Sequence, residues 1–333
     1  MINLSRRTFT FGLSAGSAAV GVSPHPTFAQ GQPQGQASST TQGQADHAKS
    51  LPPAAQFKIG RFTITALADG YADMPFSYFP GRDAKQVEDM ANTMAMAKPG
   101  GVRFVFNQYI VDDGERLILI DGGPAGTLGK TGRLPSAMVA VGIRPDSIDA
   151  IIITHMHQDH MGGLVAGGRQ NFPKAEVYVD RRDVVHWTDP AKRASAPDYL
   201  KASFDISAEM MRLYPKLQQT NGNHQITRGV SLVDLTGHTP GHIGVRVEDG
   251  GQSLLMVSDM LFPVVHPAAT DINFLFEQDR DAAKAMRAKF FPRAAEEKAL
   301  IAATHMPFPG LGRIMSDAGK MRWMGAEWAY QDL

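Results

Sequence analysis

The chain has 333 residues, of which 43% are hydrophobic and 20% are charged, so it is long enough for one or two domains with a sizeable core. Its formal net charge is zero, which gives no electrostatic reason to expect nucleic acid or an anionic membrane as a partner. It has no cysteine, which excludes disulfides, thiol chemistry and cysteine-based zinc sites. Any metal would therefore be held by histidine, aspartate or glutamate.

The N-terminal residues have the features of an export signal. Arg6 and Arg7 precede a mildly apolar run of small residues, and Thr27-Phe28-Ala29 then offers a cleavage site. Because this order is typical of a bacterial Tat signal, we expect residues 1–29 to be a signal peptide and the protein to be periplasmic or secreted. Residues 30–53 have almost no large apolar side chain and are predicted to be a disordered tether. No apolar run is long enough to span a membrane.

Residues 54–333 are predicted to form one domain in which strands and helices mix, an α/β or α+β fold with two sheets. Alternating or continuous apolar runs predict strands, which we expect at 62–67 (closed by Asp69-Gly70), 109–111, 117–120, 148–154, 177–179, 230–235, 244–247, 253–257 and 299–304, the last one. Helical patterns occupy 134–141, 198–217 and 280–290.

Residues 154–163 read THMHQDHMGG and begin where an apolar strand ends. Residues two apart in an extended chain point the same way, so His155 and His157 can converge on one ion. Asp159 and His160 follow at once and can serve a second ion nearby, where the two glycines let the chain turn. Three histidines and an aspartate at this spacing indicate a metal site rather than a core.

Three further candidate ligands follow other predicted strands. His238 comes after residues 232–235, Asp259 after 254–257 and His305 after 300–303. Together with the first cluster they make seven ligands, which suffice for two ions if Asp259 bridges them, and they leave open positions for water.

The order HxHxDH, then a distant His, an Asp and a last His, resembles the metallo-β-lactamase superfamily. Within it, the sequence looks most like the methyl parathion hydrolase and lactonase-like branch, through ITALADG at 64–70, GHTPGH at 237–242 and AATHMPFPGLG at 302–312. The resemblance runs from about residue 57 to the C-terminus. It implies an αββα sandwich, two mixed β-sheets flanked by helices, with a binuclear site at one edge of the sheets.

The resemblance also implies a ligand set. One ion would take His155, His157 and His238, and the other would take Asp159, His160 and His305, with Asp259 as the bridge.

Two further residues are expected to support the ligands. His242 competes with His238, but in the family the first histidine of HTPGH binds the metal and the second lies beside it. Asp121 ends a buried strand, and in relatives an aspartate there orients a ligand histidine by a hydrogen bond. Gly122 stands where threonine is common.

The expected chemistry is hydrolysis. Two divalent ions, zinc by default with manganese, iron or cobalt as alternatives, lower the pKa of a shared water toward neutrality. The metal-bridging hydroxide would attack a carbonyl or phosphoryl centre while one ion polarises the oxygen that gains charge. Asp159 or a metal-bound water would protonate the leaving group. No protein nucleophile is required, which agrees with the absence of cysteine and of a G-x-S-x-G motif.

The substrate depends on the pocket. By the resemblance, Trp187 and Phe204 fall where the branch places aromatic side chains around an apolar leaving group, with core packing as the alternative reading. Leu128 falls where the branch has another aromatic, so lactones or aryl esters are favoured and organophosphate triesters are expected as promiscuous substrates. His186 and His266 are further candidates for the pocket lining.

Other classes fit less well. A dedicated methyl parathion-type hydrolase and a β-lactamase would share the ions, although the agreement at 302–312 favours the hydrolase branch. A nuclease would want a basic surface, and a di-iron redox protein would want glutamate in place of His157 and a flavin domain. A non-catalytic binder would be expected to have lost ligands. The expected partner is a small ester or lactone, and residues 321–330 are a candidate homodimer interface.

Overall fold

The structure, a computed structural model, describes residues 53–265, 267–318 and 320–326. The predicted signal peptide, the predicted tether up to residue 52, His266 and residues 327–330 of the candidate interface lie outside the described residues, and those statements remain predictions. None of the described helices combines the length and apolar character needed to cross a membrane.

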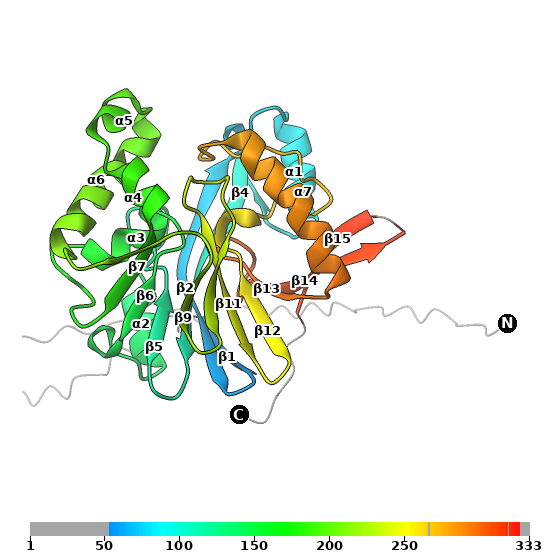
Figure 1. Ribbon diagram of the computed structural model, residues 1–333. Helices are drawn as coiled ribbons and strands as arrows, with labels where there is room; N and C mark the ends of the chain where they lie inside the picture. Colours follow the sequence, from blue (N-terminus) through cyan, green and yellow to red (C-terminus); the bar gives the residue numbers. More distant parts are fainter. Residues whose placement is uncertain (1–52, 266, 319, 327–333) are drawn as a thin grey trace, which may run out of the picture. The chain divides into compact units, whose positions relative to one another are not determined.

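Two mixed β-sheets form the centre of the fold, as the sequence predicts (Figure 1). The first has the order β1-β2-β4-β5-β6-β7-β8, with β3 paired to β4, and its strands are Ala54–Ile59, Phe62–Pro75, Ala97–Lys98 (β3), Gly101–Asp112, Leu117–Ile120, Ala150–Ile152, Glu176–Asp180 and Gln218–Thr220. The second has the order β15-β14-β13-β12-β11-β10-β9, and its strands, from β9 to β15, are His224–Thr227, Val230–Asp234, Ile243–Asp249, Gln252–Met256, Leu300–Ala302, Leu311–Asp317 and Lys320–Gly325.

Helices cover the outer faces of both sheets. The α-helices, from α1 to α7, are Ala84–Asn92, Leu134–Ala140, Gln158–Val165, Arg181–Trp187, Pro190–Ser195, Asp198–Leu213 and Arg280–Glu296. Buried side chains of α2, α3, α4 and α6 pack against the first sheet, and those of α7 pack against the second. Short 3₁₀ turns are Phe76–Tyr78 (η1), Pro145–Ser147 (η2) and Ser258–Met260 (η3). This arrangement is the expected αββα sandwich.

The core has two layers on the first sheet because its middle strands are covered on both faces. On β4, Tyr109 and Val111 face the second sheet, whereas Ile110 faces the helices. The same burial on both faces explains the continuous apolar run of β6, whose side chains are all buried. Because β5, β6 and β7 pair in parallel, their carboxyl ends lie together at one edge of the sheet.

Three expectations about the elements are wrong. The strand at 62–67 does not close at Asp69-Gly70, because β2 keeps pairing with β4 as far as Pro75 and only shifts register between Ala68 and Gly70. The strand at 299–304 is not the last, since β14 and β15 follow as a hairpin. The segment after His157 does not turn at its glycines, because it forms helix α3.

Gly163 in α3 is required for close packing rather than for a turn. Its N–H donates to the carbonyl of Gly123 over 2.9 Å, and a Cβ on Gly163 would lie 1.9 Å from the carbonyl oxygen of Gly122. The backbone of Gly122 in turn donates to the carbonyl of His160 over 2.6 Å. Helix α3 thus touches the segment after β5 backbone to backbone, which brings His160 close to Asp121.

Replacing Gly163 with alanine should therefore lower the free energy of unfolding by about 1–3 kcal/mol, because backbone must shift to relieve the overlap. Gly325→Ala is the matched control, since its Cβ would meet nothing closer than 4.0 Å. Chemical denaturation of both variants measures the difference. Equal stability of the two variants would show that the close approach is not needed.

Candidate metal centre and its pocket

Seven histidine and aspartate side chains gather where strands of both sheets end. His155 and His157 follow β6, and Asp159 and His160 lie in the first turn of α3. The remaining three come from the second sheet, namely His238 between β10 and β11, Asp259 in η3 after β12, and His305 after β13. All of these residues are buried except Asp159, whose side chain is 15% exposed.

One group of ligand atoms comes from four of these residues. His155 Nε2 lies 3.0 Å from His157 Nδ1, and His238 Nε2 lies 3.1 Å from the same atom. Asp259 Oδ2 is 3.3 Å from His238 Nε2 and 3.9 Å from His155 Nε2.

A second group lies on the other side of Asp259. Asp159 Oδ2 is 3.4 Å from His160 Nε2 and 3.5 Å from His305 Nε2. Asp259 Oδ1 is 3.3 Å from both of these nitrogens. Asp259 therefore offers one carboxylate oxygen to each group.

These separations fit metal coordination. Ligand atoms at about 2.0–2.2 Å from one tetrahedral ion lie about 3.3–3.6 Å from one another. The sets His155–His157–His238, His155–His160–Asp259 and Asp159–His160–His305 each have their ligand atoms within 4.8 Å of one another. His160 Nε2 is buried and has no hydrogen-bond partner in the protein, which suits a nitrogen that binds a metal ion. The residues present can hold divalent metal.

Burial and mutual charge set the protonation of the ligands. Burial lowers the pKa of His157 to about 4, and it lowers the pKa of His238 well below the usual value. Both rings are therefore neutral near pH 7 and can donate a lone pair. Burial alone would raise the pKa of Asp259, but the rings of His305 and His160 outweigh it and hold this pKa well below its usual range.

Asp121 contacts His160, one of the candidate ligands, at the position that the resemblance implies. Its Oδ2 lies 2.8 Å from His160 Nδ1, and its Oδ1 accepts the backbone N–H of Thr154 over 2.8 Å. This contact leaves His160 Nε2 pointing at the ligand group. Gly122 suits this packing, since a Cβ there would lie 2.3 Å from the side chain of Leu164.

His242 lies beside the first group but is not part of it. Its ring is 5.2 Å from that of His155 and 5.6 Å from that of His238. Its Nδ1 lies 3.1 Å from the carbonyl of Leu235, which holds the ring in place. The geometry therefore favours His238 over His242 as the ligand.

Asp183 is a supporting residue that the sequence analysis missed. This fully buried carboxylate, on α4, accepts the backbone N–H of Met156 over 2.8 Å and that of Gly241 over 2.6 Å. It also accepts the hydroxyl of Thr239 over 2.9 Å. One side chain thus connects the segment of His155 and His157 to the loop after His238. Nothing in the local pattern around Asp183 distinguishes it from a surface acid.

A cavity of about 210 Å³ opens onto the ligand groups. Its floor is polar and is formed by His157, Gln158, Asp159, Ser203, Asp259 and His305. Its walls are apolar or aromatic and are formed by Met74, Tyr78, Phe104, Leu128, Tyr199, Phe274 and Phe276. Leu128 is thus placed in the wall, where the resemblance puts it.

Trp187 and Phe204 are not in this wall, contrary to the expectation. Trp187 is fully buried and packs edge-on behind His157, with ring centroids 5.0 Å apart, and Phe204 packs on Trp187 at 4.7 Å. His186 contacts the same two rings and is also absent from the described lining. Trp187 and Phe204 sit on α4 and α6 with their rings in the core, which a helical pattern alone cannot distinguish from a pocket.

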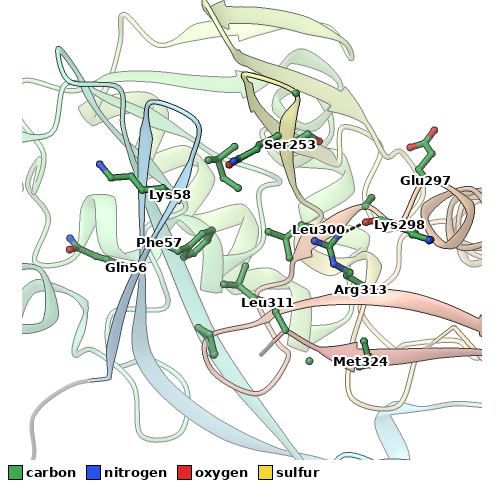
Figure 2. Close-up of a pocket in the computed structure, with 17 residues that line it drawn as sticks. Gln56, Phe57, Lys58, Ser253, Glu297, Lys298, Leu300, Leu311, Arg313 and Met324 are labelled. Atoms are coloured by element: carbon green, nitrogen blue, oxygen red, sulfur yellow. Dashed lines mark hydrogen bonds between the residues drawn. The ribbon is translucent and has the colours of Figure 1, made fainter. Parts of the chain in front are cut away.

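A larger cavity of about 760 Å³ lies elsewhere in the fold (Figure 2). It is bordered by β1, the starts of β12 and β13, and the β14–β15 hairpin, with Lys58, Lys298 and Arg313 at its rim. Its described lining contains no histidine or aspartate. Because Asp259 and His305 follow the ends of β12 and β13, this cavity is at the opposite end of those strands from the ligands.

The family is now identifiable. Residues 103–305 match the sequence model of the Metallo-beta-lactamase superfamily, so the chain belongs to that superfamily. Among curated relatives, an N-acyl homoserine lactonase of Bacillus thuringiensis is 27% identical over 127 residues, which are 38% of this chain and 44% of the lactonase. The chain therefore aligns with less than half the length of that relative.

Solved structures agree with this assignment. The hydrolase AbOPH, described as in the beta lactamase superfamily, matches 84% of this chain and 100% of its own, with a TM-score of 0.78 and 28% identity. AidC, described as a dizinc quorum-quenching lactonase, covers 84% of this chain and 99% of its own, with a TM-score of 0.75 and 24% identity. The second likeness shows the shared fold alone.

Asp183→Asn should weaken the connection between the two ligand segments, because an amide nitrogen would face N–H donors that now meet a carboxylate. We expect a loss of about 1–3 kcal/mol in the free energy of unfolding, measured by denaturation, together with weaker retention of metal during dialysis. Asp198→Asn is the control, since its side chain is 95% exposed. Wild-type stability and metal retention in Asp183→Asn would contradict this role.

Proposed function

We propose that this protein is a binuclear metal-dependent hydrolase that acts on lactones or aryl esters. The observation that carries the proposal is the position of Asp259, which offers one oxygen to each ligand group at the floor of an apolar cavity. A shared carboxylate between two sets of imidazoles suits a pair of ions rather than one.

The first ion would be held by His155, His157 and His238, the second by Asp159, His160 and His305, and both by Asp259. Zinc is the proposed metal, with manganese, iron or cobalt as alternatives for this nitrogen and oxygen set. Bound there, two divalent ions supply a hydroxide nucleophile near neutral pH and a Lewis acid for the substrate oxygen.

The protein's own residues position the substrate and carry a proton. Asp159 is the most exposed of the ligands and lines the cavity, so its carboxylate can pass a proton to a leaving group there. The aromatic walls exclude water and hold an apolar group beside the floor. This division leaves the ligands fixed while the wall selects the substrate.

The charge of the lining favours a neutral substrate. The described residues that line the cavity include no lysine or arginine. A β-lactam carboxylate would therefore find no cationic side chain to pair with, whereas a lactone or an ester needs none. The relationship to a curated N-acyl homoserine lactonase supports a lactone, although the alignment spans only 44% of that protein.

Organophosphate triesters, as in methyl parathion hydrolases, form the second candidate class. They are also neutral, and the rings of Tyr78, Phe104, Tyr199, Phe274 and Phe276 can pack on an aryl leaving group. These rings come from positions other than the ones expected from the resemblance. We therefore keep triester hydrolysis as a promiscuous activity of the same site.

A substrate panel tests the proposal. Protein loaded with zinc or manganese would be assayed on dihydrocoumarin, an acyl-homoserine lactone, methyl parathion and nitrocefin, with and without a chelator. We expect turnover of a lactone that the chelator abolishes, slower turnover of methyl parathion and none of nitrocefin. Turnover of nitrocefin above that of both lactones would contradict the argument from the uncharged lining.

Replacing Asp259 with alanine tests the shared carboxylate. We expect kcat/KM to fall by more than about 100-fold. Loss of a residue that only hydrogen-bonds to a metal ligand already lowers activity by up to about 100-fold, and Asp259 is proposed to bind both ions directly. Metal analysis should find fewer ions per chain than in the wild type. Asp281→Ala, an exposed aspartate in the first turn of α7, is the control. Full activity in Asp259→Ala would rule out the two-metal assignment.

A further inference from the structure

The aromatic wall of the cavity depends on a segment without regular secondary structure. Residues 270–279, called the aromatic segment below, precede α7 and carry Phe274 and Phe276. Phe276 contacts Tyr78 and Tyr199 at centroid distances of 5.5 and 5.3 Å, and Phe274 contacts Phe276 at 5.3 Å. A segment of this kind keeps its rings in place only if something behind it fixes the backbone.

A buried ion pair lies behind the aromatic segment. Arg287, on α7, is 1% exposed and donates to the carboxylate of Glu277, which is 5% exposed. The same guanidinium donates to the carbonyl of Ile272 over 2.7 Å and to that of Thr270 over 3.3 Å. The other oxygen of Glu277 accepts the backbone N–H of Phe274 over 3.0 Å.

Both the guanidinium of Arg287 and the carboxylate of Glu277 thus form hydrogen bonds with the backbone that carries Phe274 and Phe276. Neither Arg287 nor Glu277 is among the described residues that line the cavity, and Arg287 does not contact the ligand atoms. Burying two charges is costly and is seldom retained for stability alone, since well-packed apolar residues often do as well. A positioning role explains why the pair is here.

We propose that the Arg287–Glu277 pair is a positioning device that fixes the aromatic segment and thereby sets how tightly the apolar part of the substrate is held. The part of this inference that concerns the substrate rests on the proposed function. The part that concerns the position of the aromatic segment does not. The pair acts through Phe274 and Phe276, and its own hydrogen bonds reach none of the seven candidate ligands.

The test uses the full chain with the double substitution Arg287→Met and Glu277→Leu. Removing both charges together avoids an unpaired buried charge, so the variant is expected to fold. The matched control is Arg293→Met with Glu297→Leu, an ion pair at the C-terminal end of the same helix whose side chains are 67% and 45% exposed. Metal content is measured in all three proteins and is expected to be equal.

The first readout is hydrogen–deuterium exchange, which needs no substrate. The amides of Phe274, Leu275 and Glu277 are bonded to Glu277, Tyr78 and Phe274. We expect them to exchange at least about tenfold faster in the double variant and to be unchanged in the control. Unchanged exchange would overturn the proposal, whatever the enzyme does.

The second readout is the split between KM and kcat for γ-undecalactone, which has a long alkyl chain, and γ-butyrolactone, which has none. We expect KM for the long substrate to rise by about tenfold or more with kcat nearly unchanged, and little effect on the short one. An equal loss on both lactones would overturn a role in holding the apolar group. If the wild type hydrolyses neither, the proposed function fails, and the exchange result still decides the positioning role.

Discussion

The rest of this structure depends on a carboxylate, Asp259, that is buried among imidazole rings. An isolated buried charge costs several kcal/mol unless partners of opposite or neutralisable charge surround it. Its histidine partners within 3.3 Å are His160, from the first sheet's side, and His238 and His305, from the second. Because the three rings come from segments far apart in sequence, satisfying this one carboxylate fixes how the two sheets meet.

Two more buried carboxylates, Asp121 and Asp183, are also satisfied by groups on the segments that carry the ligands. Asp121 binds His160 and the backbone of Thr154, and Asp183 binds the backbone on either side of the first ligand group. Burial raises the pKa of Asp183 to about 6, although its hydrogen bonds pull in the opposite direction. Each carboxylate uses its acceptor capacity on the segments that carry candidate ligands and so helps to hold those segments in place.

The cavity combines a floor and a wall with different origins. The floor comes from strand ends that carry ligands, and these positions follow from sheet topology. The wall comes from the end of β2 with η1, from β4, from the loop before α2, from α6 and from the aromatic segment, which are spread along the chain from Met74 to Phe276. Such a division lets one metal centre serve many substrates within a superfamily, because the wall can change while the floor stays fixed.

The sequence by itself determined the fold class and predicted the seven candidate ligands, because HxHxDH and the strand-end positions of His238, Asp259 and His305 are local features of short motifs. It could not determine that Asp159 and His160 lie in a helix, because two adjacent glycines disfavour a helix and Gly163 is explained only by the close approach of the Gly122 backbone.

The sequence could not identify which aromatic residues form the wall of the cavity, for a related reason. The rings of Trp187 and Phe204 turn into the core, whereas those of Phe274 and Phe276 turn toward the floor, and local pattern is the same for both. Asp183 and Arg287 likewise look like ordinary surface charges in the sequence. Only tertiary structure decided their roles, because a side chain's role depends on which distant backbone group it meets when the sheets and helices pack.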